Sequence, residues 1–411
     1  MDNLTHSLAG AALAAAGLRR TTPLATATLV AAANAPDIDA CIYLFRDEYY
    51  ALAFRRGYTH GPLAMMLLPF LVAGTILAWD RLVRRRRDPR AEPARALPIL
   101  LLAVLGVLTH PALDWMNTYG IRLLAPFSMQ WFYGDALFII DPWLWLLLGA
   151  ATFVARERRG RGLVGWLVLA AAASALMFAA PMVPGAARVA WVIGLAAVVI
   201  AYRAAATSSA HAPTHATATS LVNATSPATA ARRAEPAAPE VATSPDVTEP
   251  RRLAVARWAL ALAVAYILAM VGSDIAAARL VRAVAEARGI GPVESVMVAP
   301  VPANPFSGDV VVETPSAYHL GAFRWFGRPN VRLEGDVIPR TPRDAVIDAA
   351  AATPRVHDYL VWSRFPIFRV DTLPDGYRVV VTDARYPDMG EGGGLGGVSL
   401  RLDAALRPTD D

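Results

Sequence analysis

The sequence predicts an α-helical membrane domain that crosses the bilayer several times, followed by a soluble C-terminal α+β domain, mainly antiparallel β. Hydrophobic residues make up 55% of the 411 residues and charged residues only 18%, a balance typical of proteins with several membrane spans. Towards the C-terminus, the long apolar stretches give way to short β-branched and aromatic runs broken by Pro, Gly and Asp. Such runs indicate a small sheet domain.

The membrane domain is predicted over residues 1–203, with a further transmembrane helix over 253–273. Apolar stretches approach the ~20 residues that a helix needs to cross the hydrocarbon core. They cover residues 62–80, 97–113, 136–155, 163–181, 186–203 and 253–273. The shorter, alanine-rich stretches 4–18 and 21–33 predict a helical hairpin, because small side chains allow helices to pack closely.

Two segments complete the predicted organisation. Residues 204–252 are a run of Ala, Thr, Ser and Pro that cannot bury enough apolar surface to fold, so we expect a disordered linker. Residues 274–411 should begin with a helix and continue as a sheet domain that acts as a lid or substrate selector. Its predicted strands lie in ESVMVAPVPA (294–303), GDVVVETP (308–315), YLVWSRFPIFRV (359–370) and GYRVVVTDARY (376–386).

Charge patterning gives the orientation of the chain. The net charge of +5 is small, and the basic residues cluster in short loops between apolar segments, which argues against a nucleic-acid partner. The loops 81–95 and 156–162 are the most basic, so the positive-inside rule places them in the cytoplasm. The loops 34–61 and 114–135 and the C-terminal domain then lie outside. Four arginines fall outside against this rule: Arg46, Arg55, Arg56 and Arg122.

Histidine and aspartate side chains gather where these segments meet the outer face. The group comprises His6, Asp37, Asp39, His60, His110, Asp114, Asp135 and Asp141. His110 and Asp114 are one helical turn apart, so they can present a nitrogen and an oxygen to one ion. Two imidazoles and two carboxylates suit tetrahedral Zn²⁺, and Mn²⁺ or Fe²⁺ would also accept them. The competing interpretation is that these carboxylates only cap helix ends.

The same residues carry a resemblance to a known family. MDNLTHSLAG, NAPDID, YTHGP, LTHPALDWMNTYGIRLLAPFS and WFYGDALFIIDPWLW resemble the YdjM-type family of predicted inner-membrane, metal-dependent hydrolases. The order Asp, His, His-x-x-x-Asp also resembles the zinc-dependent phospholipase C group. That likeness implies that His60, His110, Asp114 and one of Asp37 or Asp39 hold a first metal, with His6 near a second. The family resemblance implies a multi-pass protein of the bacterial inner membrane.

Together these features predict a membrane-bound hydrolase that acts on a lipid or lipid-linked phosphoester at the outer, periplasmic face. A bound Zn²⁺ would lower the pKa of its water to ~7 and polarise the scissile bond. Asp135, or whichever of Asp37 and Asp39 is not a ligand, would act as general base, and Arg122 would hold a phosphate bidentately. The alternatives are a metal or proton transporter, or a non-catalytic membrane scaffold.

Overall fold

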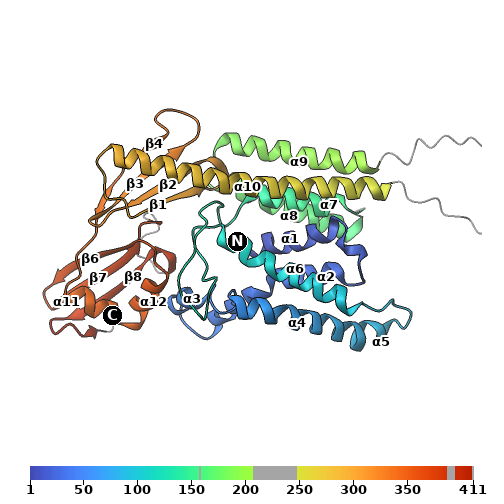
Figure 1. Ribbon diagram of the computed structural model, residues 1–411, viewed down its shortest axis with the longest axis horizontal. Helices are drawn as coiled ribbons and strands as arrows, with labels where there is room; N and C mark the ends of the chain where they lie inside the picture. The colour runs from blue at the N-terminus through green and yellow to red at the C-terminus, as the bar shows by residue number, and fades with distance from the viewer. Residues whose placement is uncertain (157–158, 207–247, 387–393, 410–411) are drawn as a thin grey trace, which may run out of the picture.

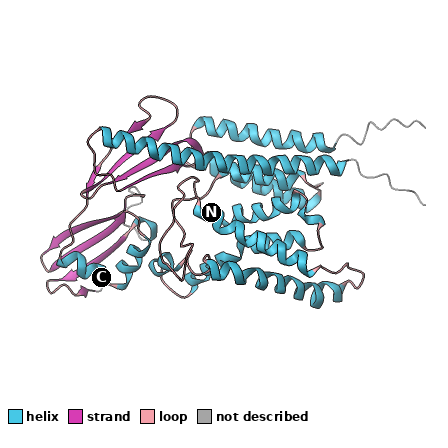
Figure 2. Ribbon diagram, in the orientation of Figure 1, coloured by secondary structure: helices cyan, strands magenta, loops and turns pink. Residues whose placement is uncertain are grey.

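The computed structural model of the chain describes residues 1–156, 159–206, 248–386 and 394–409. Figures 1 and 2 show a bundle of helices joined at one end to two antiparallel sheets, which confirms the predicted fold class. Most of the predicted linker, residues 207–247, lies outside the described residues.

Within the described residues, the bundle is built from one short hairpin, α1 (Asn3–Ala15) and α2 (Ala25–Asn34), and six further helices around it. These are α4 (Pro62–Trp79), α6 (Ala96–Trp115), α7 (Pro142–Val154), α8 (Gly160–Ala179), α9 (Gly185–Ala206) and α10 (Thr248–Ala287). Small residues bring α2 close to both α1 and α6. A Cβ added at Gly10 would lie 2.6 Å from Leu29 O, and one at Gly106 would lie 2.6 Å from the Cβ of Ala32. The hairpin therefore packs as its composition predicts.

Five of the described helices are long and apolar enough to cross a membrane. They cover Pro62–Arg87, Ala96–Trp115, Gly160–Ala179, Gly185–Ala206 and Glu249–Ala287. The predicted length of the apolar helix over 136–155 is wrong, because α7 has only 13 residues and is ~20 Å long at 1.5 Å per residue. Asp141 caps its start by accepting hydrogen bonds from Trp143 N and Leu144 N, so the helix does not reach back to residue 136.

The two ends of the bundle differ in character. Figure 1 shows the basic α5 (Arg85–Arg87) and the ends of α9 and α10 that border the undescribed residues at the right. Arg19 and Arg20 reach Glu249 at this end. The sheets lie at the left, next to the start of α4 and the loop that follows α6. The basic segments and the loops rich in His and Asp therefore lie at opposite ends, as charge patterning predicts.

The C-terminal domain contains two antiparallel meanders. The first sheet consists of β1 (Ser295–Val301), β2 (Asn304–Glu313), β3 (Ala317–Arg324), β4 (Val331–Arg332) and β5 (Val337–Pro339). The second consists of β6 (Pro366–Leu373), β7 (Gly376–Asp383), β8 (Val398–Asp403) and β9 (Pro408–Thr409), with α11 (Ala345–Ala351) and α12 (Pro354–Trp362) between the sheets in sequence.

Two features of this domain differ from the sequence prediction. The span and the helix expected after it are one helix, α10, whose last turns carry Val281 and Ala285 against the first sheet. Residues 359–362 were expected in a strand but end α12. The three-residue spacing of Val356, Tyr359 and Trp362 explains this, because it places three fully buried side chains on one helical face.

The second sheet docks onto the loops at the end of the bundle. Its α12 packs against α3 (Glu48–Phe54), and Tyr119 lies in the same apolar core as Trp362. The Trp131 indole donates a hydrogen bond to Val361 O at 2.7 Å. The C-terminal domain therefore rests directly on the segments that precede and follow the His and Asp cluster.

Candidate metal centre

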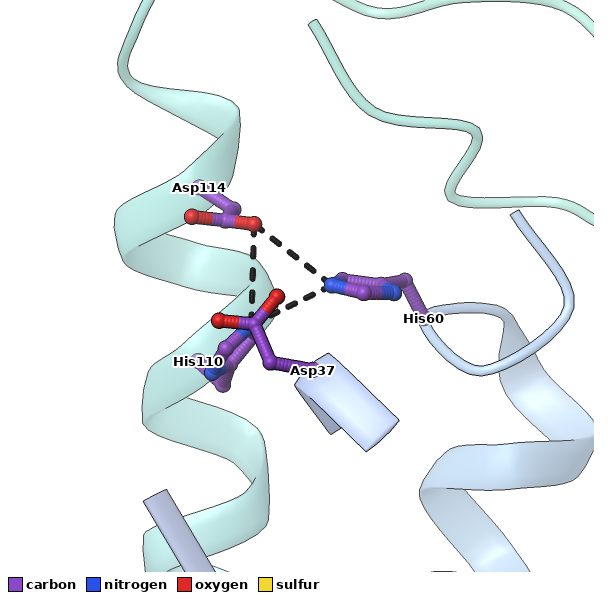
Figure 3. Close-up of side chains that lie close together, drawn as sticks. All are labelled: Asp37, His60, His110 and Asp114. Carbon is purple, nitrogen blue, oxygen red and sulfur yellow. Dashed lines mark hydrogen bonds and ion pairs between the residues drawn. The ribbon is translucent and has the colours of Figure 1, made fainter. Parts of the chain in front are cut away.

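Three segments bring four metal-ligating side chains together at the sheet-facing end of the bundle. α6 carries His110 and Asp114 one turn apart, so both project from one face of the helix. His60 lies in the turn before α4, and Asp37 lies in η2 (Ala35–Leu44), the 3-10 helix that follows α2. Figure 3 shows the four side chains converging, and one ligand atom from each lies within 4.8 Å of the others.

The shortest distance in the cluster joins two imidazole nitrogens. His60 Nε2 and His110 Nε2 are 3.1 Å apart, and Asp114 Oδ2 lies 3.5 Å from each of them. Asp37 Oδ1 lies 3.8 Å from His110 Nε2. Two nitrogens bound to one tetrahedral Zn²⁺ at about 2.0–2.1 Å would be about 3.3 Å apart, so the imidazole spacing suits a shared ion.

The other ring nitrogens fix the tautomers. His110 Nδ1 lies 2.7 Å from Ala33 O, and a carbonyl only accepts, so Nδ1 carries the proton. Thr59 Oγ1 donates to Asp39 Oδ2 at 2.9 Å and can then accept from His60 Nδ1, also at 2.9 Å. Both Nε2 atoms therefore present lone pairs to each other. That contact is unfavourable without a cation between them and is the usual arrangement of metal-binding imidazoles.

Asp114 combines complete burial with an unsatisfied oxygen. Its Oδ2 accepts no hydrogen bond from the described residues, although Arg56 Nε lies 3.0 Å away. Its Oδ1 contacts the Met1 amino group and lies 3.2 Å from His6 Nε2. Buried polar atoms in native proteins are nearly always bonded, so the open oxygen favours an additional ligand here.

Asp37 and Asp39 occupy different positions around the cluster. Asp37 belongs to the four-residue group, whereas Asp39 lies behind His60, with Oδ2 at 3.4 Å from His60 Nδ1. Asp39 Oδ2 also accepts a hydrogen bond from Arg56 N at 2.9 Å. Through the Thr59 hydroxyl, which contacts both groups, this carboxylate orients the His60 imidazole.

His6 lies beside the cluster rather than within the four-residue group. Its ring stacks on His110 with centroids 3.8 Å apart and an interplanar angle of 16°. Its Nε2 faces Asp114 Oδ1, while its buried Nδ1 has no hydrogen-bond partner among the described residues. His6 is thus placed to hold Asp114 in position.

Arg122 and Asp135 were predicted to act on substrate, and both are engaged in structural contacts. Arg122 Nη2 donates to three carbonyls at the end of α3, those of Ala53, Phe54 and Arg55. Asp135 accepts two hydrogen bonds from Arg364 Nη1, at 3.0 and 2.8 Å. Arg122 therefore holds the end of a helix, and Asp135 joins the loop after α6 to the C-terminal domain.

Two arginines that the sequence prediction gave no role lie at the cluster. Arg55 Nη2 donates to Asp37 Oδ1 at 3.0 Å, and Arg56 Nε lies beside Asp114 Oδ2. Their position in the sequence could have indicated a role, because both arginines lie on the predicted outer side, where the positive-inside rule disfavours basic residues. Their adjacency to the His60 turn would have strengthened that signal.

The electrostatic setting favours metal binding. Burial lowers the pKa of the His60 imidazole, so the ring is neutral at neutral pH and its Nε2 can act as a ligand. Neutral imidazoles and carboxylates form the donor set of Zn²⁺, and of Mn²⁺ and Fe²⁺ as well. The residues present therefore fit a divalent metal ion.

Comparison with known proteins finds a family that the N-terminal part of the chain is similar to. Residues 1–183 match the family model described as YdjM inner membrane protein. This match confirms the resemblance to the YdjM-type family predicted from the sequence, and it covers α1 to α8 of the membrane domain. With five apolar helices long enough to span, the chain is a multi-pass inner membrane protein.

A curated relative covers a smaller part of the chain. The chain is 26% identical over 156 residues to the uncharacterized protein YfhP of Bacillus subtilis (strain 168). The match covers 36% of this chain and 43% of that protein, so the chain spans less than half the length of this relative. No solved structure matches the chain.

Proposed function

We propose that this protein is a membrane-bound, metal-dependent hydrolase that acts on a lipid or lipid-linked phosphoester. The observation that carries the proposal is the pair of imidazole Nε2 atoms, both lone-pair-bearing and 3.1 Å apart. They lie beside a buried carboxylate oxygen, Asp114 Oδ2, that accepts no hydrogen bond from the described residues. Neutral histidines and aspartates that converge on one point form a hydrolytic metal site more readily than a purely structural cluster, which would satisfy its own polar atoms.

The proposed ligands are the four residues whose donor atoms converge. His60 and His110 would bind through Nε2, Asp114 through Oδ2 and Asp37 through Oδ1. When bound, a divalent ion, most simply Zn²⁺, supplies Lewis acidity that activates water and polarises an ester. Asp39 would hold the His60 ring through the Thr59 hydroxyl, which lies 2.9 Å from both Asp39 Oδ2 and His60 Nδ1, and His6 would hold Asp114 through Oδ1.

The substrate proposal rests on where the cluster lies in the bundle. It lies at the end of α6 and just before α4, two helices long and apolar enough to cross the membrane. Such a site is near the level of the lipid headgroups, where a membrane phosphoester presents its polar part. A lipid or lipid-linked ester is therefore favoured over a fully water-soluble substrate.

A hydrolysis assay tests the proposed function. Purified protein reconstituted with Zn²⁺, Mn²⁺ or Fe²⁺ should cleave a phospholipid or lipid-linked phosphodiester in mixed micelles. His110→Ala should abolish turnover, whereas His319→Ala, a histidine of β3 far along the chain in the C-terminal domain, should not. Stoichiometric metal without turnover of any phosphoester would contradict hydrolysis and favour a transport or structural role.

We also propose that the cluster and the C-terminal domain face the periplasm. The basic loop 81–95 lies at the opposite end of the bundle from the sheets, and basic loops remain in the cytoplasm. An alkaline phosphatase fusion after residue 411 should be active, because that enzyme matures only outside the cytoplasm. Activity of a cytoplasmic reporter at the same position would overturn this orientation.

A further inference from the structure

Burial around the cluster is uneven, and the unevenness shows where a substrate can enter. His60, His110 and Asp114 are at most 1% exposed, whereas Asp37 is 9% exposed. The Arg55 side chain, which donates to Asp37, is 21% exposed. The Asp37–Arg55 edge is therefore the part of the cluster that comes closest to the surface.

Arg55 gives this edge an anion-binding group. Its Nη2 donates to Asp37 Oδ1 at 3.0 Å, and its Nε lies at a longer 3.4 Å from Asp39 Oδ1. The guanidinium thus spans two carboxylates that also face His110 and His60. A phosphoester drawn to a metal held by those histidines would meet this guanidinium first, and guanidinium binds phosphate bidentately.

Large apolar side chains lie immediately beside the same edge. The segment 38–45, which continues η2 from Asp37, exposes most of its large side chains: Ile38, Tyr43, Leu44 and Phe45 are 61%, 47%, 78% and 77% exposed. The Arg55 guanidinium carbon lies 5.7 Å from the centre of the Tyr43 ring, so charge and apolar surface adjoin. Apolar groups concentrated on one short segment indicate contact with lipid or an apolar ligand.

We infer that Arg55 and the segment 38–45 form an entry site for an amphiphilic phosphoester. The anionic head is bound by the Arg55 guanidinium next to Asp37, and the hydrocarbon chain lies against Ile38, Leu44 and Phe45. This inference rests on the proposed function and specifies its substrate: a molecule with a phosphate and an apolar chain joined closely enough to contact both. Neither a free phosphate nor a neutral lipid satisfies both halves of the site.

The single cysteine of the chain offers a probe at this position. Cys41 is exposed and lies within the segment 38–45, so a thiol-reactive environment-sensitive dye labels that segment alone. The labelled, metal-loaded full chain in nanodiscs is titrated with dodecyl phosphate, ethyl phosphate and dodecyl maltoside. Dodecyl phosphate should shift the emission to the blue and bind about tenfold more tightly than either partial ligand, because it alone supplies both contacts.

Variants separate the two halves of the site. Arg55→Gln should remove the preference for dodecyl phosphate over dodecyl maltoside, and Arg55→Lys should retain only part of it, because lysine lacks the planar fork. Phe45→Ser should remove the preference over ethyl phosphate. Phe326→Ser is the matched control, since Phe326 is similarly exposed, at 72%, but lies after β3 in the C-terminal domain.

The outcomes distinguish this inference from the proposed function. Equal affinity for ethyl phosphate and dodecyl phosphate, or equal effects of Phe45→Ser and Phe326→Ser, would overturn the apolar half. If both Arg55 variants keep the preference for dodecyl phosphate over dodecyl maltoside, Arg55 does not bind the anionic head. Selective binding of dodecyl phosphate without turnover of any ester would support the entry site and contradict hydrolysis.

Discussion

Two regions of this protein bury aspartate beside arginine, and they differ in how fully the carboxylate is satisfied. In the C-terminal domain, Asp383 accepts hydrogen bonds from the Arg385 guanidinium at both oxygens, at 2.9 and 3.0 Å. At the cluster, Asp114 Oδ2 accepts none from the described residues and faces His60 Nε2 and His110 Nε2. Asp383 and Arg385 thus form a closed pair, in which the carboxylate is fully hydrogen-bonded. The side chains around Asp114 form an open cluster, in which one carboxylate oxygen accepts no hydrogen bond from the described residues.

The difference separates a structural role from a ligand-binding one. Burial opposes ionisation of Asp383, but the charge and hydrogen bonds of Arg385 outweigh it and hold the pKa of that carboxyl below its usual value. Arg385 Nη1 also donates to Thr118 O at 2.8 Å, which ties the closed pair to the loop after Asp114. The closed pair therefore fastens the C-terminal domain to the segment that follows the open cluster.

The largest expected effect comes from breaking the closed pair. Arg385→Gln leaves Asp383 buried without its countercharge and should lower the free energy of unfolding of the C-terminal domain by about 3–5 kcal/mol. Urea unfolding of the full chain in detergent measures this loss. Arg340→Gln is the control, because its pair with Glu294 is exposed and should contribute only ~0–1 kcal/mol. Equal losses in the two variants would contradict the distinction.

The next effect tests the carboxylate behind the open cluster. Asp39→Asn weakens the acceptor of the Thr59 hydroxyl that contacts His60 Nδ1, and should reduce metal affinity by about 10–100-fold, with little change in the stability of the C-terminal domain. Competition with a chelating dye measures the affinity. Asp47→Asn is the matched control, since Asp47 caps α3 through Tyr50 N at an exposed position and asparagine caps equally well. If both variants bind metal alike, Asp39 does not orient a ligand.

A smaller effect tests whether contacts with the C-terminal domain help the open cluster to bind metal. The Tyr119 ring lies between Trp362, at 5.4 Å between ring centres, and the Arg56 guanidinium, at 4.5 Å. Tyr119→Leu removes a cation–π contact worth ~0.5–2 kcal/mol and should weaken metal binding a few-fold through Arg56 and Asp114. Tyr119→Phe keeps the ring and loses only a hydroxyl that is buried without a hydrogen-bond partner in the described structure. Equal metal affinity in Tyr119→Leu and Tyr119→Phe would show that metal binding at the open cluster does not depend on this contact with the C-terminal domain.

The smallest effect is a pH dependence of the closed pair. The folded pKa of Asp383 lies below its unfolded value of ~3.9, so the unfolded state binds more protons in that range. The stabilisation by Asp383 is therefore fully present above about pH 4 and is lost as pH falls through the folded pKa. The difference in unfolding midpoint between wild type and Asp383→Asn should therefore stay constant above about pH 4 and shrink as the pH falls further. A difference that stays constant below about pH 4 as well would mean that Asp383 contributes no charge-dependent stability.

The sequence predicted the open cluster better than its surroundings, for a physical reason. His110 and Asp114 are one helical turn apart, and helix geometry alone brings them to one face. Asp37 and Asp39 could not be distinguished, because the 3-10 conformation of η2 decides which side chain faces α6. The roles of Arg55 and Arg56 depend on the path of the loop before His60, which no local pattern fixes.

The closed pair escaped sequence analysis entirely because it depends on tertiary contacts. Asp383 ends β7 and Arg385 follows two residues later. Nothing local indicates that the guanidinium of Arg385 reaches the carbonyls of Thr118 and of Trp362 at the end of α12. The helical segment Val356–Trp362 was missed because its aromatic and β-branched composition resembles a strand. Its three-residue spacing was the better guide, since burial follows periodicity more closely than composition.

The most direct test of the open cluster is the metal content of protein purified without chelator. Elemental analysis of wild type should find a stoichiometric divalent ion, and His60→Ala and His110→Ala should each lose it. His357→Ala, which removes a histidine of α12 outside the cluster, should retain the metal. Wild type without stoichiometric metal, or His110→Ala protein that retains all of it, would contradict the assignment of these residues as ligands.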